Sequence, residues 1–309
     1  MKYWAIMELN FLFKMRNSEY SYGVKSKYFI FIFSVVAYFC ASTAVFAQTA
    51  SLAFFPSQVI QGDPIMIQVE GKTASEIKKI TFDGKKLGVF TYKGKPTALY
   101  GVDLNKKTGV YEVVAEFSDG SATSSAVTVG ERKKIEAPLS IPAKLGGDTP
   151  ASQTKLVSTL ADENKNLASA HTGTKAFWKT VFSPPLKELF VTDEYGYSRK
   201  TGVYTIAHKG ADYRAEEGTP VTAMNRGVVR IAKTYRNYGK TVVVDHGLGL
   251  MTFYMHLSKI HVNVGELVLP GQIIGKSGQT GYAEMPHLHL TVRIGGVSID
   301  PVKFMELFR

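Results

Sequence analysis

The stretch "MPHLHLTVRI" at residues 285–294 alternates polar and apolar residues, and this pattern decides how the C-terminal part of the chain folds. Successive side chains of a β-strand point to opposite faces, so an alternating stretch has one apolar and one polar face. The polar face carries His287, His289, Thr291 and Arg293. Because the leucine, valine and isoleucine residues between them can enter a core, the two histidines must face a groove, solvent or a metal.

A second stretch, "GLMTFYMHLS" at residues 249–258, alternates in the same way. Strict alternation places Tyr254 and His256 on one face of a strand and Phe253 and Met255 on the other. We therefore expect His256, with Tyr254 beside it, to look away from the apolar core into a polar groove.

The third stretch, "HKGADY", places His208 and Asp212 four positions apart around a glycine, and an irregular strand of this kind can turn both side chains inward. Two histidines and a carboxylate around one point leave an open position for water, which is typical of catalytic zinc. A structural zinc site needs four ligands, usually with Cys, and the only cysteine of the chain is Cys40. Histidines left unligated beside the metal could act as general bases or hydrogen-bond to an oxyanion.

Four motifs of this part resemble those of the lysostaphin-type zinc endopeptidases, which cut peptidoglycan cross-bridges. They are "HKGADY", "YMHLS", "GKSGQTG" and "PHLHL", and they occur in the family's order and spacing within residues 190–300. Each motif alone is weak, whereas four in order are specific. The resemblance also implies the family's fold, a narrow groove on an antiparallel sheet.

Position by position, the resemblance implies that His208, Asp212 and His289 bind one Zn²⁺ ion and that His256 and His287 assist catalysis. Zinc lowers the pKa of its bound water to roughly 7 and polarises a carbonyl group. One of the two remaining histidines would take the proton of the water and the other would stabilise the tetrahedral intermediate. The implied activity is that of a zinc metalloendopeptidase acting on peptidoglycan peptide cross-links.

The front of the chain, from residue 51 to about 129, reads as short alternating strands separated by Asp-Gly and similar turn signals. This spacing predicts a small β-sandwich of immunoglobulin type. Leu156, Leu160 and Leu167 lie at helical spacing and predict a short amphipathic helix. The expected fold class is therefore mainly all-β: a sandwich, a short helix, and an antiparallel sheet with the metallopeptidase groove.

Four segments are predicted: a signal peptide at 1–47, an immunoglobulin-like domain at 48–130, a linker with the helix at 131–185, and the metallopeptidase domain at 186–309. The linker assignment rests on mixed charge, Pro and Gly. The hydrophobic residues at 177–185 suggest the further hypothesis that they and the helix block the groove in a latent form.

The apolar run at 28–48 follows two lysines and ends in small residues, as a secretory signal cleaved after Ala47 does. An uncleaved membrane anchor is the alternative. We expect export to the periplasm, cell envelope or medium, and a monomer that meets a membrane only through an uncleaved signal. The mature chain would lack cysteine and carry 32 Lys and Arg against 24 Asp and Glu, a charge of +8. Such a surplus favours anionic cell-wall polymers over nucleic acid outside a cytoplasm.

Two other functions fit parts of the pattern. Some relatives lose metal ligands and act as non-catalytic wall-binding regulators of other hydrolases, but here every ligand is present. Non-haem iron oxygenases also use two histidines and a carboxylate, yet they generally space the first pair as H-x-D, whereas His208 and Asp212 are four apart. His246 is expected to hydrogen-bond the turn beside it.

Overall fold

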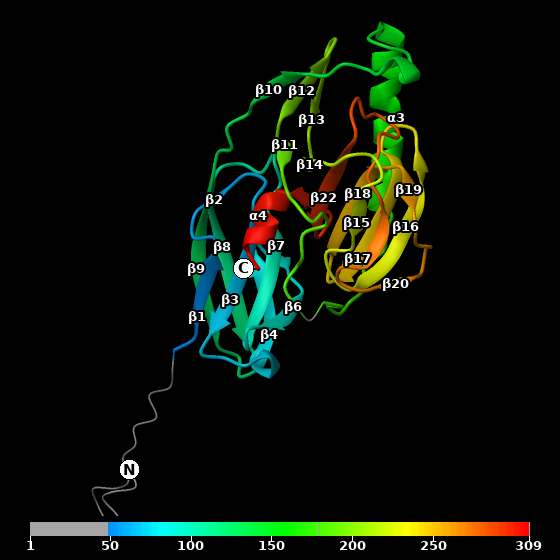
Figure 1. The fold of residues 1–309 in the computed structure, drawn as a ribbon. Coiled ribbons are helices and arrows are strands. Elements are labelled where there is room, and N and C mark those ends of the chain that lie inside the picture. Colours follow the sequence, from blue (N-terminus) through cyan, green and yellow to red (C-terminus); the bar gives the residue numbers. More distant parts are fainter. Residues whose placement is uncertain (1–48, 179, 309) are drawn as a thin grey trace, which may run out of the picture. The chain divides into compact units, whose positions relative to one another are not determined.

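The computed structural model describes residues 49–178 and 180–308, so the predicted signal peptide lies outside the described residues. Thr49–Arg309 forms one compact unit. Strands dominate it (Figure 1), which confirms the mainly all-β fold class. Neither helix of the described part is long and apolar enough to cross a membrane.

The front part of the unit contains two sheets around one core. The four-stranded sheet has the order β1-β3-β7-β6, with β1 at Ser51–Phe55, β3 at Pro64–Glu70, β6 at Val89–Tyr92 and β7 at Lys95–Gly101. The five-stranded sheet has the order β2-β9-β8-β4-β5, with β2 at Val59–Ile60, β4 at Ile77–Phe82, β5 at Lys85–Lys86, β8 at Gly109–Phe117 and β9 at Ala122–Gly130. Alternate residues of both sheets, such as Ile65, Ile67, Val113 and Ala115, fill the shared core. A β-sandwich is therefore present, and its immunoglobulin type stays a prediction.

An eight-stranded antiparallel sheet organises the second part. Its order is β11-β14-β22-β18-β17-β16-β20, with β23 beside β22. The strands are β11 at Val191–Asp193, β14 at Ala211–Arg214, β16 at Gly227–Tyr235, β17 at Gly239–Gly247, β18 at Leu250–Leu257, β20 at Leu267–Val268, β22 at His287–Ile294 and β23 at Val297–Ile299. Because β22 lies between β14 and β18, its residues can meet side chains from both neighbours.

Two small sheets border the large one. The sheet β15-β21-β19 has β15 at Pro220–Thr222, β19 at Lys259–Ile260 and β21 at Ile273–Lys276. The sheet β10-β12-β13 has β10 at Glu136–Pro138, β12 at Ser198–Thr201 and β13 at Tyr204–Ala207. The predicted linker thus contributes a strand, β10, which pairs in parallel with β12.

Four short or helical segments complete the fold: η1 at Ala74–Glu76, η2 at Ala143–Leu145, α3 at Pro150–Ala168 and α4 at Pro301–Glu306. The α3 helix is the one that the leucine spacing predicts. It begins after Thr149, whose hydroxyl accepts a hydrogen bond from the Ser152 amide, and Pro150 occupies its first turn. These two residues fix where the helix starts.

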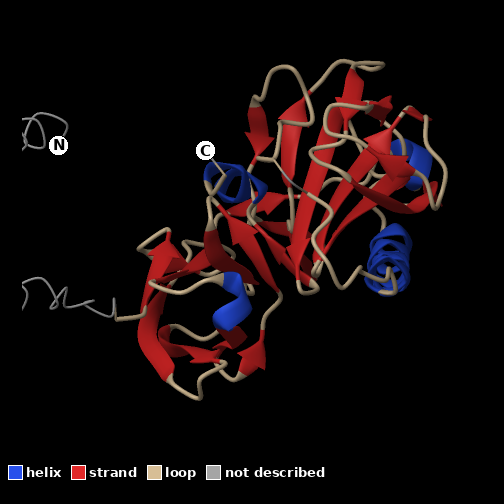
Figure 2. Ribbon diagram, turned by 90° about the horizontal axis from the view of Figure 1, so that it is seen from below, coloured by secondary structure: helices blue, strands red, loops and turns tan. Residues whose placement is uncertain are grey.

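The two faces of the large sheet contribute to two different clusters of buried hydrophobic side chains. The apolar residues of β22, Leu288, Leu290 and Val292, enter the main core. On the other face, Leu167 of α3 packs with Phe253, Met255 and other residues of the central strands. Figure 2 shows helices beside the strands of this part. The alternation of β22 is as predicted, and α3 shields the sheet face opposite the main core.

The alternation expected for β18 is wrong. Tyr254 lies in the main core, where its hydroxyl accepts a hydrogen bond from the Met224 amide, and Phe253 and Met255 lie on the groove face. The cause is an extra residue: Met255 and His256 together face Thr241 of β17, since the register shifts there by one. His256 has φ 60, the left-handed conformation of a β-bulge. The bulge reverses the alternation, so His256 still reaches the groove.

One half of the latency hypothesis, that residues 177–185 cover the groove, is also wrong. Trp178 and Phe182 are buried in the main core, on the opposite face of the sheet. The ring of Phe182 packs edge-on against Phe304 at 4.9 Å between centroids, and that of Trp178 against Phe90 at 5.0 Å. This segment therefore stabilises the fold by apolar burial instead of blocking a site.

Candidate metal centre

The register of β14 on β22 brings three potential ligands together. Asp212 lies opposite His289 in the ladder, and His208 precedes β14 at the end of β13. Asp212 Oδ1 is 2.7 Å from His289 Nδ1 and 3.2 Å from His208 Nε2, and the two ring nitrogens are 3.1 Å apart. All three side chains are buried. The structure thus assembles the three residues expected to bind zinc.

The second nitrogen of each imidazole fixes which atom faces the centre. His208 Nδ1–H donates to the Glu194 carbonyl at 2.8 Å, so Nε2 presents a lone pair to the centre. The Thr291 hydroxyl donates to the Lys209 carbonyl and accepts from His289 Nε2–H, so Nδ1 of His289 presents a lone pair too. Two nitrogen lone pairs and a carboxylate oxygen therefore face one another, an arrangement that a cation stabilises.

The protonation states agree with this arrangement. Burial lowers the pKa of His289 to about 4, although the nearby Asp212 carboxylate acts in the opposite direction. Burial raises the pKa of Asp212, but the adjacent His208 and His289 hold it well below its usual range. A neutral imidazole and an ionised carboxylate are the forms that bind a metal ion.

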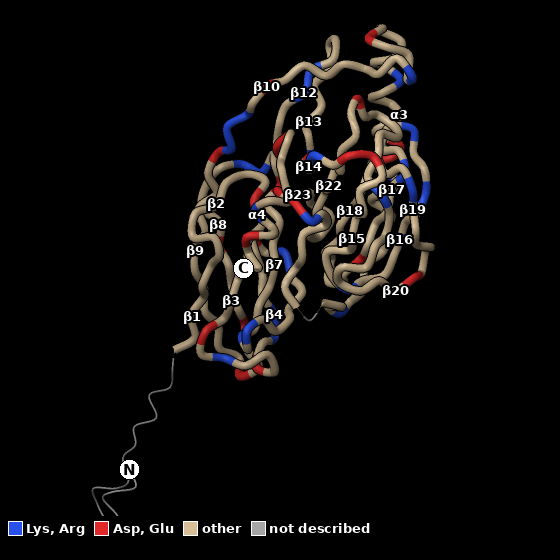
Figure 3. The backbone as a smooth tube through the Cα atoms, viewed as in Figure 1, with Lys and Arg blue, Asp and Glu red and all other residues tan. Residues whose placement is uncertain are grey.

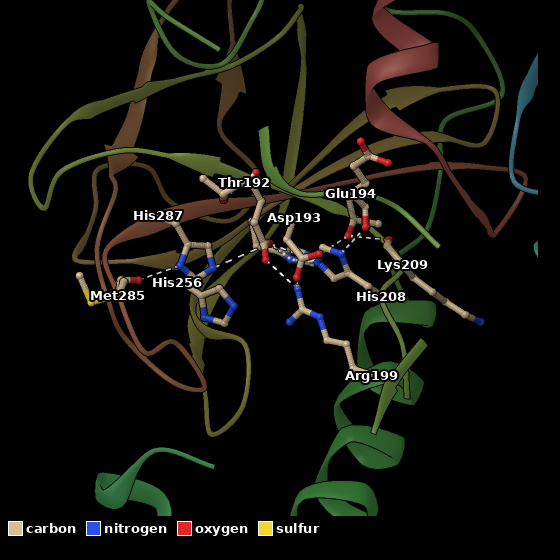
Figure 4. A network of polar contacts seen from close by, with 12 residues as sticks. Thr192, Asp193, Glu194, Arg199, His208, Lys209, His256, Met285 and His287 are labelled. Carbon is tan, nitrogen blue, oxygen red and sulfur yellow. Dashed lines mark hydrogen bonds and ion pairs between the residues drawn. The ribbon is translucent and has the colours of Figure 1, made fainter. Parts of the chain in front are cut away.

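The outer oxygen of Asp212 has a partner that the sequence analysis missed. Arg199 of β12 donates from Nη2 to Asp212 Oδ2 at 2.9 Å and also pairs with Asp193, which lies opposite Asp212 in the sheet (Figure 4). The guanidinium therefore holds Asp212 so that Oδ1 alone faces the histidines. No spacing pattern distinguishes Arg199 from other basic residues, because β12 meets the site only through the folded hairpin.

His256 and His287 lie beside the three potential ligands. Their ring centroids are 4.9 Å apart, and His287 Nε2 is 3.8 Å from Asp212 Oδ1. His256 Nδ1–H donates to the Thr280 carbonyl at 2.9 Å. His287 Nδ1–H donates to the Met285 carbonyl at 2.8 Å (Figure 4). Each ring thus keeps Nε2 free. The five residues singled out in the sequence are all brought together.

The Gly-rich turn "GKSGQTG" supports both of these histidines. Besides Thr280, it supplies Gly278, whose carbonyl accepts a hydrogen bond from the His287 amide at 3.1 Å. Burial lowers the pKa of His256 to about 3, and the neighbouring His287 and His289 act in the same direction. His256 is therefore neutral at pH 7 in the metal-free chain.

The centre opens into a cavity of about 680 Å³. The sheet side contributes His256, His289, Thr291 and Arg293. The opposite side comes largely from α3, which turns Leu156, Val157, Leu160 and Ala161 toward the same space. A cavity of this size, with a few polar groups on one side, has the dimensions of a site for a short peptide.

His246 lies apart from the centre. Its Nδ1–H donates to the Arg226 carbonyl at 2.9 Å, and Nε2 is 2.9 Å from the Thr252 hydroxyl. The side chain is fully buried, and burial lowers its pKa to about 4. It joins the residue before β16 to β18 inside the core, so it is a structural residue, although its carbonyl partner is not in the turn expected.

Residues 206–301 match the family model "Peptidase family M23". A 96-residue stretch is 42% identical to the peptidoglycan DD-endopeptidase ShyA of Vibrio cholerae, covering 31% of this chain and 22% of ShyA. The chain spans about a quarter of the length of the curated relatives it matches first.

Two solved structures are similar. The catalytic domain of lysostaphin from Staphylococcus simulans is 33% identical, and the match covers 38% of this chain and 92% of that domain, with a TM-score of 0.35. A peptidase M23 structure from Pseudomonas aeruginosa has a TM-score of 0.60 and 24% identity, and the match covers 80% of this chain and 95% of that one, which shows a shared fold. Residues 206–301 therefore belong to a domain of peptidase family M23, in agreement with the resemblance to the lysostaphin-type metallopeptidases.

Proposed function

We propose that the chain is an exported zinc endopeptidase that hydrolyses peptide cross-links of bacterial peptidoglycan. The observation that carries the proposal is the centre of His208, Asp212 and His289, where three lone pairs converge without a donor between them. The similarity to ShyA, a peptidoglycan DD-endopeptidase, supports the substrate class.

A zinc ion bound there would supply a Lewis acid and a water of pKa roughly 7. The residues of the chain would then divide the remaining work. His287 is partly exposed at the mouth of the centre, whereas His256 is buried. Because an exposed imidazole can exchange its proton with solvent, we assign proton transfer to His287. His256, fixed by the Thr280 carbonyl, would orient the scissile group on the other side.

The positive charge would assist retention on an anionic wall. Lys and Arg occur at several separate places along the chain, interspersed with Asp and Glu (Figure 3). Retention would therefore act through the summed charge of the chain, it would be weak at each point, and it would fall with rising salt.

The test is digestion of purified peptidoglycan by the full chain, beside His289→Ala and the matched control His261→Ala at an exposed position. We expect the parent and the control to bind about one zinc per chain, by metal analysis, and to release peptides with a newly freed amine, by mass spectrometry. His289→Ala should do neither. Zinc binding without cleavage would instead favour a non-catalytic regulator, and absence of metal binding would refute the assignment of the centre.

A further inference from the structure

Arg293 lies on the groove face of β22, four residues beyond His289. Its guanidinium stacks on the Phe253 ring at 4.5 Å from the centroid, and its Nε donates to the Ser298 hydroxyl at 3.2 Å. These two contacts fix the guanidinium group through one face of its plane and through Nε. The edge that carries Nη1 and Nη2 stays available to a ligand, in the fork geometry that binds a carboxylate with two hydrogen bonds.

The charge of Arg293 lacks a counter-ion within the described residues. Three other arginines, Arg132, Arg199 and Arg230, each pair with a buried or partly buried carboxylate. For Arg293 no such pair forms among residues 49–178 and 180–308. Burial accordingly lowers the pKa of Arg293. A half-buried, unpaired cation is costly unless a bound anion completes it.

The cavity around Arg293 is electropositive. Its lining includes Arg199, Lys209 and Arg293, and Asp103 is the single acidic residue among the described lining residues. Asp193 and Asp212 balance the charge of Arg199, so Lys209 and Arg293 outweigh Asp103 by one positive charge. The cavity that contains His256 and His289 is thus suited to an anionic ligand.

The separation of Arg293 from the centre fits a peptide. Four residues along a strand span about 13 Å between Cα atoms, and an extended peptide in the groove covers that distance in about four residues. A carboxylate at the end of such a peptide, or on a side chain nearer the scissile bond, can therefore reach Arg293 while the scissile carbonyl lies at the centre.

We infer that Arg293 is a specificity residue that binds a carboxylate of the peptide substrate, so that the chain prefers carboxylate-bearing cross-links over neutral ones. The inference rests on the proposed function, because it names the substrate class of the same groove. Arg293 binds and orients the substrate, and it takes no part in the chemical step.

The test compares soluble cross-linked peptides, released from peptidoglycan, with the same peptides after their carboxylates are converted to amides. With the zinc-loaded full chain, we expect amidation to raise KM about 10- to 100-fold, the range of a hydrogen-bonded charge pair, and to change kcat little. Arg293→Gln should raise KM for the carboxylate form and abolish the discrimination. Arg293→Lys should recover part of it. The matched control Lys233→Gln removes one exposed charge outside the cavity and should behave as the parent.

A second arm measures equilibrium binding of the carboxylate and amide peptides, fluorescently labelled, to the metal-free full chain, where no carboxylate can bind zinc. Tighter binding of the carboxylate form, lost in Arg293→Gln, supports the subsite even if no cleavage occurs, so failure of the proposed function is recognised separately. Equal binding of the two peptides to the parent chain overturns the inference. This comparison needs no variant, so it holds even if Arg293→Gln does not fold.

Discussion

Replacing Gly210 with alanine should weaken metal binding through a single methyl group. An ideal Cβ at this position would lie 2.4 Å from His289 Nε2 and 2.6 Å from the Leu290 carbonyl, whereas ordinary contacts begin at 3.4 Å. The ring or the strand must therefore move by about 1 Å in a densely packed interior. Rotation of the ring alone leaves the clash with the Leu290 backbone. The chain segment between His208 and Asp212 has to shift as well.

Loss of alignment among ligands and their hydrogen-bond partners typically costs 10- to 100-fold in metal affinity. Overpacking of a full interior adds about 1–3 kcal/mol of lost folding stability. We expect Gly210→Ala to show both, measured by competition for zinc with a chromogenic chelator and by thermal unfolding of the metal-free chain. The control Gly271→Ala introduces strain at φ +77 but meets no atom within 4 Å, so its zinc affinity should equal that of the parent. Parental zinc affinity and unfolding temperature in Gly210→Ala would refute the reasoning.

Two further predictions concern stability. Burial lowers the pKa of His246 to about 4, below its ordinary value of 6.5. Between these two pH values the unfolded chain binds a proton that the folded chain does not. The free energy of unfolding therefore falls as the pH drops from 6.5 to 4. The contribution is about 3 kcal/mol; urea unfolding of the metal-free chain between pH 7 and 4 should show it, and His246→Asn should have a shallower slope. Arg132 donates to Asp63 at 2.8 Å and lies 3.2 Å from Asp300, so Arg132→Ala should leave two buried carboxylates unpaired and cost about 3 kcal/mol. An unchanged unfolding temperature in Arg132→Ala would contradict this account.

The sequence predicts the two faces of β22 correctly because the alternation of its residues continues without a break in its pairing with the neighbouring strands. Leu288 and Leu290 are buried in the main core while His287 and His289 face the groove, as strict alternation requires. The same rule fails one strand away. A bulge at His256 adds one residue, and nothing in "FYMHLS" marks it, since a left-handed residue here is neither Gly nor Asn. For that reason the predicted position of Tyr254, on the groove face, is wrong.

Contacts between distant segments lie beyond any local pattern. Arg199 meets Asp212 because the hairpin of β12 and β13 folds over the centre. The leucine spacing predicted α3, but the spacing could not show that Leu167 packs on the sheet around Phe253 and Met255. Periodicity gives the faces of each element, and tertiary packing decides which faces meet.

The bulge at His256 also relates the position of this histidine to the length of β18. At its present length and without the bulge, β18 would alternate plainly and turn His256, like Tyr254, toward the main core. If Met255 were deleted, His256 would follow Tyr254 directly, and plain alternation would leave His256 on the groove face and Leu257 in the main core. When related sequences are aligned, a single gap in β18 before the histidine should therefore be read as loss of the bulge, with the centre retained where all four histidines and the aspartate are present.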